Sequence, residues 1–128
     1  MRWDEGMIGD QSGKVAIVTG SNTGIGYYMA RALASKGASV VMACRDSGKG
    51  DGARDRILQE FPDSKVSVSV LDLADLSSIE EFASRFPSEG GLDILINNAG
   101  VMIPPKSRTK DGFELQFGTN HLGHFALT

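Results

Sequence analysis

Three glycines at the junction of a predicted strand and a predicted helix could bind a phosphate group. The stretch from Thr19 to Gly26 reads Thr-Gly-Ser-Asn-Thr-Gly-Ile-Gly. A turn without side chains before a helix exposes unpaired N–H groups and the positive end of the helix dipole, which attract anions. We expect Gly20 to form the turn, Gly24 to admit a pyrophosphate and Gly26 to let helix and strand touch. The alternative is a plain strand-to-helix turn, which also favours glycine.

The spacing of these glycines is informative because it differs from two commoner phosphate-binding motifs. It is Gly-x-x-x-Gly-x-Gly, whereas the most frequent dinucleotide fingerprint is Gly-x-Gly-x-x-Gly. No Lys-Ser or Lys-Thr pair follows Gly26, so the stretch is not a P-loop.

A basic residue follows the second predicted strand, where a dinucleotide-binding fold usually has an acid for the ribose 2′-hydroxyl. Here the strand ends Cys44-Arg45-Asp46. A guanidinium can hold a 2′-phosphate through charge-assisted hydrogen bonds, and Lys49 could add a second positive contact. This pattern favours NADP over NAD. The alternative is that Arg45 is an ordinary surface residue and Asp46 turns inward to the ribose.

Polar residues also follow the third and fourth predicted strands, at the edge where such sheets bind ligands. Asp72, followed by Leu73, could accept a hydrogen bond from an adenine amino group, or it could merely cap the next helix. The fourth strand ends Asn97-Asn98-Ala99-Gly100. Asparagines there can tie neighbouring loops together, and the small residues after them leave room for a ribose.

Short apolar runs alternate with helical repeats, which indicates a parallel sheet covered by helices. Right-handed crossovers then predict an α/β, Rossmann-type doubly wound sheet, truncated after about four strands in the order 3-2-1-4. The third strand alternates apolar and small polar residues, as an edge strand does. The predicted strands are at 14–18, 39–44, 66–70 and 92–96, and the predicted helices end near 36, 61 and 86, with a further helix from Phe113 onward.

Each predicted helix has an expected cap or an expected buried stripe. Ser47 can cap the second helix, whose glycines at 48, 50 and 52 should weaken its start, and Asp75 can cap the third. The apolar stripe of the first helix comprises Ile25, Tyr28, Met29, Ala32 and Leu33. The stripe of the third comprises Leu76, Ile79, Phe82, Ala83 and Phe86.

Composition narrows the classes of function. The 128 residues carry a formal charge of -3, which argues against a nucleic-acid partner. The single cysteine, Cys44, excludes an internal disulfide and fits the cytoplasm, and it reads as a small core residue rather than a nucleophile. We find no signal peptide and no apolar run long enough for a bilayer, so we expect a cytoplasmic protein without a membrane partner.

Taken together, these motifs resemble the short-chain dehydrogenase/reductase family. The match covers residues 13–128 and includes the glycine motif, Asp72-Leu73, Asn97-Asn98-Ala99-Gly100 and Asn120. Ala43-Cys44-Arg45-Asp46 and the stretch from Asn120 to Phe125 are similar to the branch of retinol dehydrogenases and protochlorophyllide reductases. The resemblance implies an NADP-dependent oxidoreductase that transfers a hydride between NADP(H) and an alcohol or carbonyl substrate, often as a homo-oligomer.

The resemblance also implies a role for each matched residue. Asn120 would belong to the catalytic group. The pyrophosphate would lie on Gly20, Ser21, Asn22, Thr23, Gly24, Ile25 and Gly26; the 2′-phosphate on Arg45; and the adenosine near Asp72, Leu73, Asn98, Ala99 and Gly100. His121 and His124 are more simply structural or pocket residues than metal ligands, because no third ligand is evident.

The chain departs from the family where catalysis is concerned. The family uses a Ser and a Tyr-x-x-x-Lys pair, in which the Lys lowers the pKa of the Tyr for proton exchange. The only tyrosines here are Tyr27 and Tyr28, and neither has a lysine four residues on. We therefore expect an N-terminal arm over 1–12 and an NADP-binding half-domain over 13–128 that lacks the catalytic half and is inactive as it stands. The alternative is a non-catalytic NADP-binding or protein-interaction module.

Overall fold

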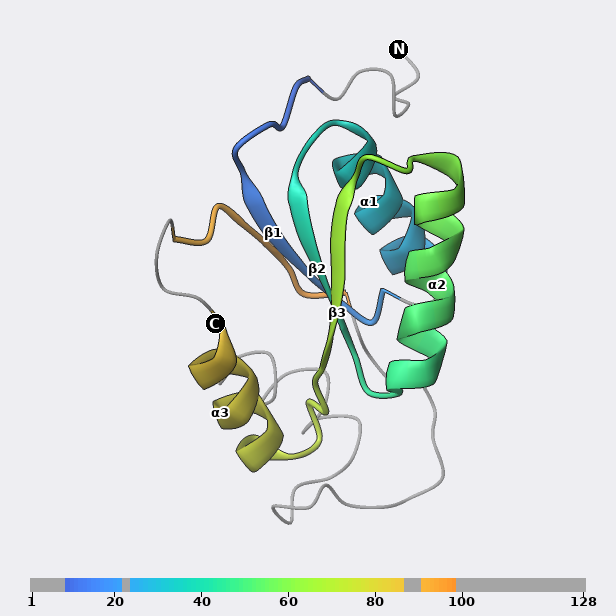
Figure 1. Cartoon of the computed structure of the whole chain (residues 1–128). Helices are drawn as coiled ribbons and strands as arrows, with labels where there is room; N and C mark the ends of the chain where they lie inside the picture. Colours follow the sequence, from blue (N-terminus) through green and yellow to red (C-terminus); the bar gives the residue numbers. More distant parts are fainter. Residues whose placement is uncertain (1–8, 22–23, 87–90, 99–128) are drawn as a thin grey trace.

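A computed structural model describes residues 9–21, 24–86 and 91–98 of the chain. Its centre is a four-stranded parallel sheet in the order β3-β2-β1-β4 (Figure 1). This confirms the predicted α/β class and strand order. The strands are β1 (Val15–Thr19), β2 (Ser39–Cys44), β3 (Lys65–Val70) and β4 (Ile94–Ile96), and the helices are α1 (Gly24–Ser35), α2 (Ser47–Glu60) and α3 (Leu76–Arg85).

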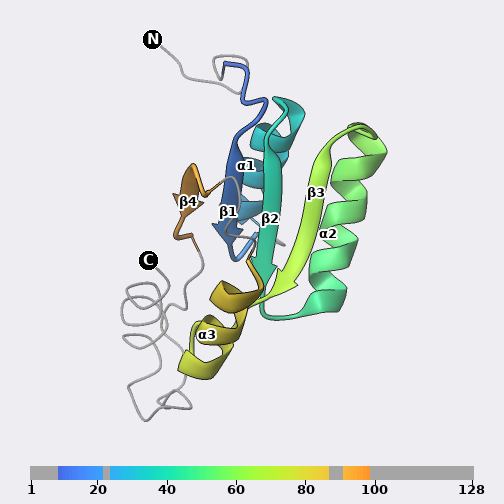
Figure 2. The same cartoon turned by 60° about the vertical axis from the view of Figure 1, so that its left-hand side comes forward.

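The helices cover both faces of the sheet, with α1 and α2 on one face and α3 on the other (Figure 2). Successive side chains of a strand point to opposite faces, so β1 contributes to both cores. Val18 packs with residues of α1 and α2, whereas Ile17 packs with Ile79 and Phe82 of α3. Burial on both faces explains why β1 and β2 are continuous apolar runs.

Tyr27 and two alanines of α1 pack in the core beside the sheet, and two large residues of the predicted stripe do not. Ala30 and Ala34 are buried in the core, while Ile25 and Tyr28 are 72% and 57% exposed. The predicted apolar stripe of this helix was therefore wrong for its two largest members. Ala30 and Ala34 lie one turn apart, and their small size allows the helix axis to approach the strands closely. This close packing outweighs the hydrophobicity of the larger side chains.

Charged residues hold α2 against α1. The guanidinium of Arg56 lies 4.6 Å from the ring centroid of the buried Tyr27. At the other end of the helix pair, Arg31 forms an ion pair with Glu60 and lies over the ring of Phe61. The hydrogen bond from Arg31 lowers the pKa of Glu60. These contacts fix the position of α2, whose first turn lies beside the glycine motif.

The start of α2 corrects one expectation. The cap is Asp46 and not Ser47, because Asp46 has an extended backbone and its carboxylate accepts the N–H of Lys49. The helix includes its three early glycines, although each costs up to about 1 kcal/mol relative to alanine. One of them has a clear packing role: a Cβ on Gly50 would lie 2.7 Å from a methyl of Val68 in β3.

The third helix and the last strand follow the predictions only in part. Asp75 caps α3 as expected and accepts the N–H of Ser77 at 2.9 Å. Ile79 and Phe82 are buried, but Leu76 and Ala83 of the predicted stripe are exposed because α3 touches the sheet along a narrow line. Strand β4 begins only at Ile94, and the preceding Asp93 accepts the N–H of Val15 through its carboxylate.

Candidate functional site

The glycine turn lies at the carboxyl end of β1, where α1 begins. Gly20 and Gly24 both have φ of 61°, a left-handed conformation that favours glycine. The N–H of Gly20 donates to the carbonyl of Ala43 in β2 at 2.9 Å, which holds the turn over the edge of the sheet. A Cβ on Gly24 would meet no atom of the described residues within 4 Å, its two chain neighbours aside. Among these residues, the backbone of Gly24 is therefore not covered by another part of the chain.

Gly26 shows the opposite environment within the same motif. A Cβ at this position would lie 2.5 Å from the carbonyl oxygen of Gly20 and 2.4 Å from the amide nitrogen of Asn98. No side chain fits there. Gly26 permits a close contact, but not the predicted one with a strand, because the nearest atoms belong to the turn and to Asn98, the second residue after β4.

Asn98 ties the end of β4 to the glycine turn. Its side-chain Nδ2 donates to the carbonyl oxygens of Thr19 and Gly20, both at 3.3 Å. Its backbone N–H donates to the hydroxyl of Thr19 at 2.9 Å. This amide is thus engaged with the protein backbone, and it fixes the two carbonyls that set the shape of the turn.

The side chain of Ser21 faces the protein interior. It is fully buried, and its hydroxyl lies 3.7 Å from the sulfur of Cys44. In this geometry only the backbone of Ser21 can contact a ligand in the turn. Cys44 is itself buried at the end of β2, which confirms its interpretation as a core residue.

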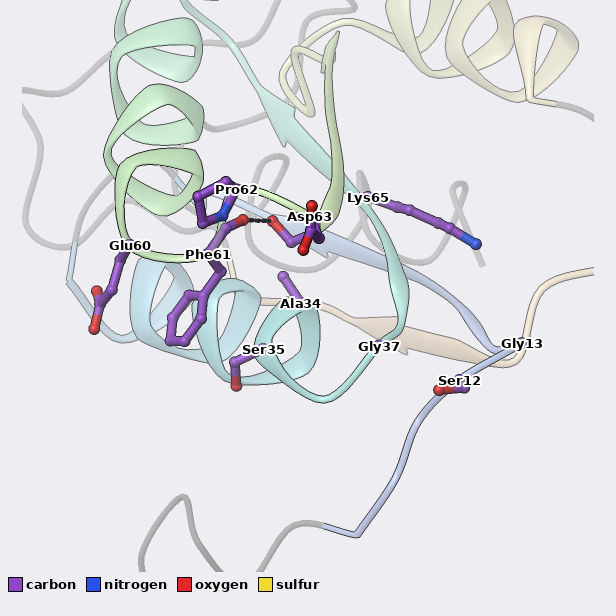
Figure 3. A pocket seen from close by; sticks show the side chains of 11 residues that line it. Ser12, Gly13, Ala34, Ser35, Gly37, Glu60, Phe61, Pro62, Asp63 and Lys65 are labelled. Atoms are coloured by element: carbon purple, nitrogen blue, oxygen red, sulfur yellow. Dashed lines mark hydrogen bonds between the residues drawn. The ribbon is translucent and has the colours of Figure 1, made fainter.

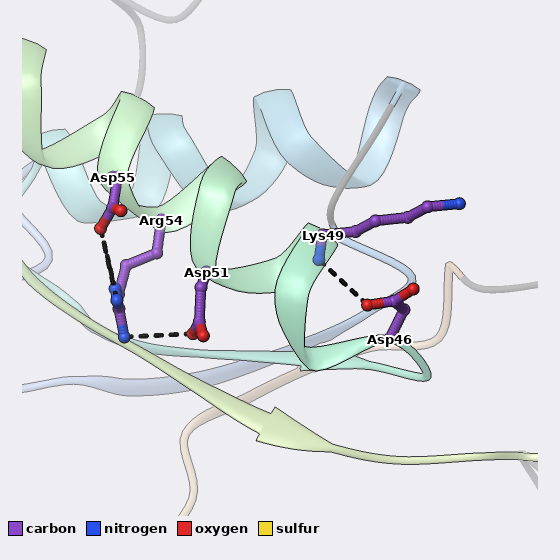
Figure 4. Close-up of polar contacts among 5 residues, drawn as sticks. All are labelled: Asp46, Lys49, Asp51, Arg54 and Asp55. Atoms are coloured by element: carbon purple, nitrogen blue, oxygen red, sulfur yellow. Dashed lines mark hydrogen bonds and ion pairs between the residues drawn. The ribbon is translucent and has the colours of Figure 1, made fainter.

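Positive charge gathers at the neighbouring junction, where β2 leads into α2. Arg45 and Lys49 are exposed, and they line an open hollow of about 480 Å³ together with Asp46 and Ser47. The side chain of Lys49 extends away from the helix, while the carboxylate of Asp46 is turned to the backbone N–H of Lys49, 3.1 Å away (Figure 4). The side chains of Arg45 and Lys49 therefore border the hollow, and the carboxylate of Asp46 beside them already accepts a hydrogen bond.

Asp72 lies at the carboxyl end of the sheet, beyond β3. Its carboxylate accepts the N–H of Ala74 at 2.9 Å, and its own N–H donates to the hydroxyl of Ser78 at 2.8 Å. It shapes the turn before α3, but the cap of that helix is Asp75, so the interpretation of Asp72 as the cap is wrong. Leu73 beside it is buried in the α3 core.

A second hollow, of about 490 Å³, lies at the opposite end of the sheet (Figure 3). Its lining includes Ser12, Ala34, Phe61 and Lys65, from the approach to β1, the end of α1 and the connection from α2 to β3. Open parallel sheets bind ligands outside the carboxyl ends of their strands. This hollow is at the amino ends and is remote from every described residue of the candidate site.

The structure brings together the described candidates from three strand ends: the glycine turn after β1, Arg45 and Lys49 after β2, and Asn98 after β4. The role of Asp46 as a helix cap was missed, although an aspartate just before a helix is itself a capping signal. Asn22, Thr23, Ala99, Gly100, Asn120 and the two histidines lie outside the described residues.

The described part of the chain contains neither a candidate metal site nor a candidate membrane-spanning helix. No group of three His, Cys, Asp or Glu side chains that could hold a metal ion occurs there. Nor does any helix in residues 9–21, 24–86 and 91–98 have the length and apolar character that a bilayer crossing requires.

Comparison with known proteins agrees with the geometry. Residues 14–128 match the family described as short chain dehydrogenase. Retinol dehydrogenase 12 of Mus musculus is 56% identical over 117 residues, which are 91% of this chain and 37% of that protein. The chain thus spans little more than a third of the length of this curated relative.

Solved structures share the fold over nine-tenths or more of this chain. An uncharacterized protein from Mycobacterium paratuberculosis superposes with a TM-score of 0.90 at 45% identity, covering 100% of this chain and 45% of the other. A metagenomic short-chain oxidoreductase in complex with NADP gives a TM-score of 0.77 at 31% identity, covering 91% of this chain and 53% of the other. The chain belongs to the short-chain dehydrogenase/reductase family of oxidoreductases, which use nicotinamide cofactors.

Proposed function

We propose that this chain is the cofactor-binding part of an NADP-dependent oxidoreductase that transfers a hydride between NADP(H) and an alcohol or carbonyl substrate. The observation that carries the proposal is the backbone of Gly24 at the start of α1, with φ of 61° and, among the residues that the structure describes, no atom outside its chain neighbours within 4 Å of a Cβ. A pyrophosphate fits this space, where helix N–H groups and the helix dipole favour negative charge.

The choice of NADP rests on the charge at the end of β2. Arg45 and Lys49 border one hollow beside the glycine turn, and a guanidinium there pairs with a 2′-phosphate. Asp46 accepts a helix N–H through one carboxylate oxygen, which reduces its capacity to bind a ribose hydroxyl as an NAD-binding acid does. The related oxidoreductase in complex with NADP supports the same choice.

The nicotinamide cofactor supplies the hydride, and the described residues bind and orient it. Proton exchange needs other groups, since Tyr28 is exposed on α1 beside the phosphate turn and Tyr27 is covered by Arg56. Neither tyrosine has a lysine four residues on. We therefore propose that these 128 residues bind the cofactor without catalysing hydride transfer by themselves.

A second candidate is a non-catalytic NADP-binding or protein-interaction module, which needs no tyrosine with a lysine four residues on. The two candidates differ in turnover. Hydride transfer by the natural full-length protein, followed as NADPH absorbance with alcohol or carbonyl substrates, supports the oxidoreductase. Cofactor binding without turnover by that protein supports the module.

Calorimetric titration with NADP⁺ and NAD⁺ tests the cofactor proposal. We expect NADP⁺ to bind at least about tenfold more tightly, and Arg45→Ala to remove most of that difference through loss of a charge-assisted contact. The matched control is Arg54→Ala, because Arg54 is on α2, the helix that follows Arg45, but pairs with Asp51 and Asp55 (Figure 4). Equal affinities for the two cofactors, or equal effects of the two substitutions, would contradict the proposal.

A further inference from the structure

Asp46 sits between the two cations of the proposed 2′-phosphate site, where an acid should weaken phosphate binding. It lines the same hollow as Arg45 and Lys49. Like charges in one site repel, so a carboxylate there opposes an incoming phosphate. The presence of an acid at this point needs a physical explanation beyond cofactor contact.

The explanation lies in the first turn of α2. Asp46 has φ of -106° and ψ of 111°, and its Oδ1 accepts the N–H of Lys49 at 3.1 Å. This is the geometry of a helix N-cap, which satisfies a backbone donor that has no partner within the helix. The hydrogen bond fixes the backbone of Lys49 relative to the strand end that carries Arg45.

This turn depends on its cap more than most helix starts do. Glycines at 48, 50 and 52 leave the chain much freedom in the unfolded state and weaken the helix at its beginning. A Cβ on Gly48 would lie 3.3 Å from Oδ1 of Asp46, so glycine also leaves room for the capping carboxylate.

The same turn is pressed against the sheet. Gly50 is buried, and a Cβ there would lie 2.7 Å from a Val68 methyl and 3.3 Å from the sulfur of Cys44. The cap and this close contact hold the turn at both ends. Lys49, which lies between them, therefore leaves the helix from a fixed point beside Arg45.

We propose that Asp46 is a positioning residue for cofactor selectivity. Its hydrogen bond to the N–H of Lys49 holds Arg45 and Lys49 around one hollow, and this gain exceeds the repulsion from its own charge. The inference rests on the proposed NADP site. Asp46 then has two effects of opposite sign: its cap strengthens binding of the 2′-phosphate, and its negative charge weakens that binding.

Substitutions can divide these two effects. Asparagine caps helices as well as aspartate but carries no charge, and serine does the same with a shorter side chain. Alanine removes both cap and charge. Asp55→Asn is the matched control, because Asp55 is exposed on the same helix and pairs with Arg54 instead of capping a backbone group.

The test is calorimetric titration of each purified full-length variant with NADP⁺ and with NAD⁺. For Asp46→Asn and Asp46→Ser we expect NADP⁺ to bind about threefold more tightly than to the natural protein, because one repulsive charge is gone. For Asp46→Ala we expect NADP⁺ to bind about fivefold more weakly than to the asparagine variant, because the cap is lost. NAD⁺ affinity should change less than about twofold throughout, since NAD⁺ has no 2′-phosphate.

Other results would overturn the inference in recognisable ways. Equal tightening of NADP⁺ binding in the alanine and asparagine variants would show that Asp46 acts through charge alone. Loss of NAD⁺ affinity in Asp46→Asn would show that the carboxylate binds the ribose. If alanine prevents folding, Asp46→Gly replaces it as the variant without a side-chain cap. A natural protein with no preference for NADP⁺ would instead contradict the proposed function itself.

Discussion

The first two strand-to-helix junctions of this fold use glycine in opposite ways. At the junction of β1 and α1, a Cβ on Gly24 would meet no atom of the described residues within 4 Å, its chain neighbours aside. At the junction of β2 and α2, Gly50 lies against β3, and a Cβ there would lie 2.7 Å from Val68. One glycine leaves room for a ligand, and the other lets protein surfaces touch.

A glycine-rich junction is therefore not by itself a ligand site. Within the first motif, Gly26 already belongs to the packed kind, since Asn98 and the carbonyl of Gly20 occupy the space that a side chain would need. Gly24 combines a left-handed backbone with open space among the described residues, but Gly13 and Gly91 share both features and precede β1 and β4. A binding glycine is therefore distinguished also by its place at the carboxyl end of the sheet, where Gly24 begins α1. The three predictions that follow test this distinction in order of decreasing effect on stability.

The largest effect is expected for Gly26→Ala. The added methyl would collide with a backbone carbonyl and with an amide group that is itself bonded to the turn, so overpacking should cost about 3 kcal/mol of unfolding free energy. Urea denaturation measures this change. The control is Gly52→Ala, where the site is open and helical, and where stability should rise by about 0.5–1 kcal/mol. Similar stabilities for both variants would show that Gly26 is not tightly packed.

A smaller loss is expected for Gly50→Ala, because the atom in the way belongs to a side chain. Moving the methyl of Val68 should cost about 1–2 kcal/mol. Val68→Ala removes that methyl, so the second substitution should cost less in the Gly50→Ala background than alone, which a double-mutant cycle measures. Additive effects would mean that the two residues do not touch.

Gly24→Ala should cost no more stability than Gly50→Ala but should affect binding most. Its left-handed backbone costs a non-glycine residue about 1–2 kcal/mol, with no collision to add. The same methyl would enter the space proposed for the pyrophosphate, so NADP⁺ affinity should fall by more than about tenfold, well beyond the loss of stability. Titration and denaturation of one sample compare the two. A variant that binds NADP⁺ normally would place the cofactor elsewhere.

Much of this fold could be predicted from the sequence, because strand and helix patterns depend on local periodicity. The runs before Thr19 and up to Cys44 predict central strands, and they are buried on both faces. The buried face of α1 could not be predicted in this way. Close packing of the helix on the sheet, and not hydrophobicity alone, decides which residues are buried. Ala30 is therefore buried and Ile25 is exposed.

Part of the candidate site could likewise be predicted from local sequence, and part depends on how the strands pair. The glycine spacing and Arg45 are local features, and the sequence alone indicates a phosphate site with a cation beside it. The engagement of Asn98 with the turn depends on β4 lying next to β1. The sequence predicts this order and asparagines that tie neighbouring loops together, but not which two carbonyls Asn98 binds. The burial of Ser21 against Cys44 likewise depends on how β1 and β2 pair.

Backbone amide shifts during titration with NADP⁺ test the central claim most directly, that open glycine backbone and a neighbouring arginine bind the cofactor. We expect the largest shifts at Gly20, Gly24 and Gly26, with further shifts at Arg45 and Lys49 that NAD⁺ does not reproduce. Residues of the opposite hollow, such as Phe61 and Lys65, should not respond. Shifts centred on that hollow, or an unchanged glycine turn at saturating NADP⁺, would contradict the account.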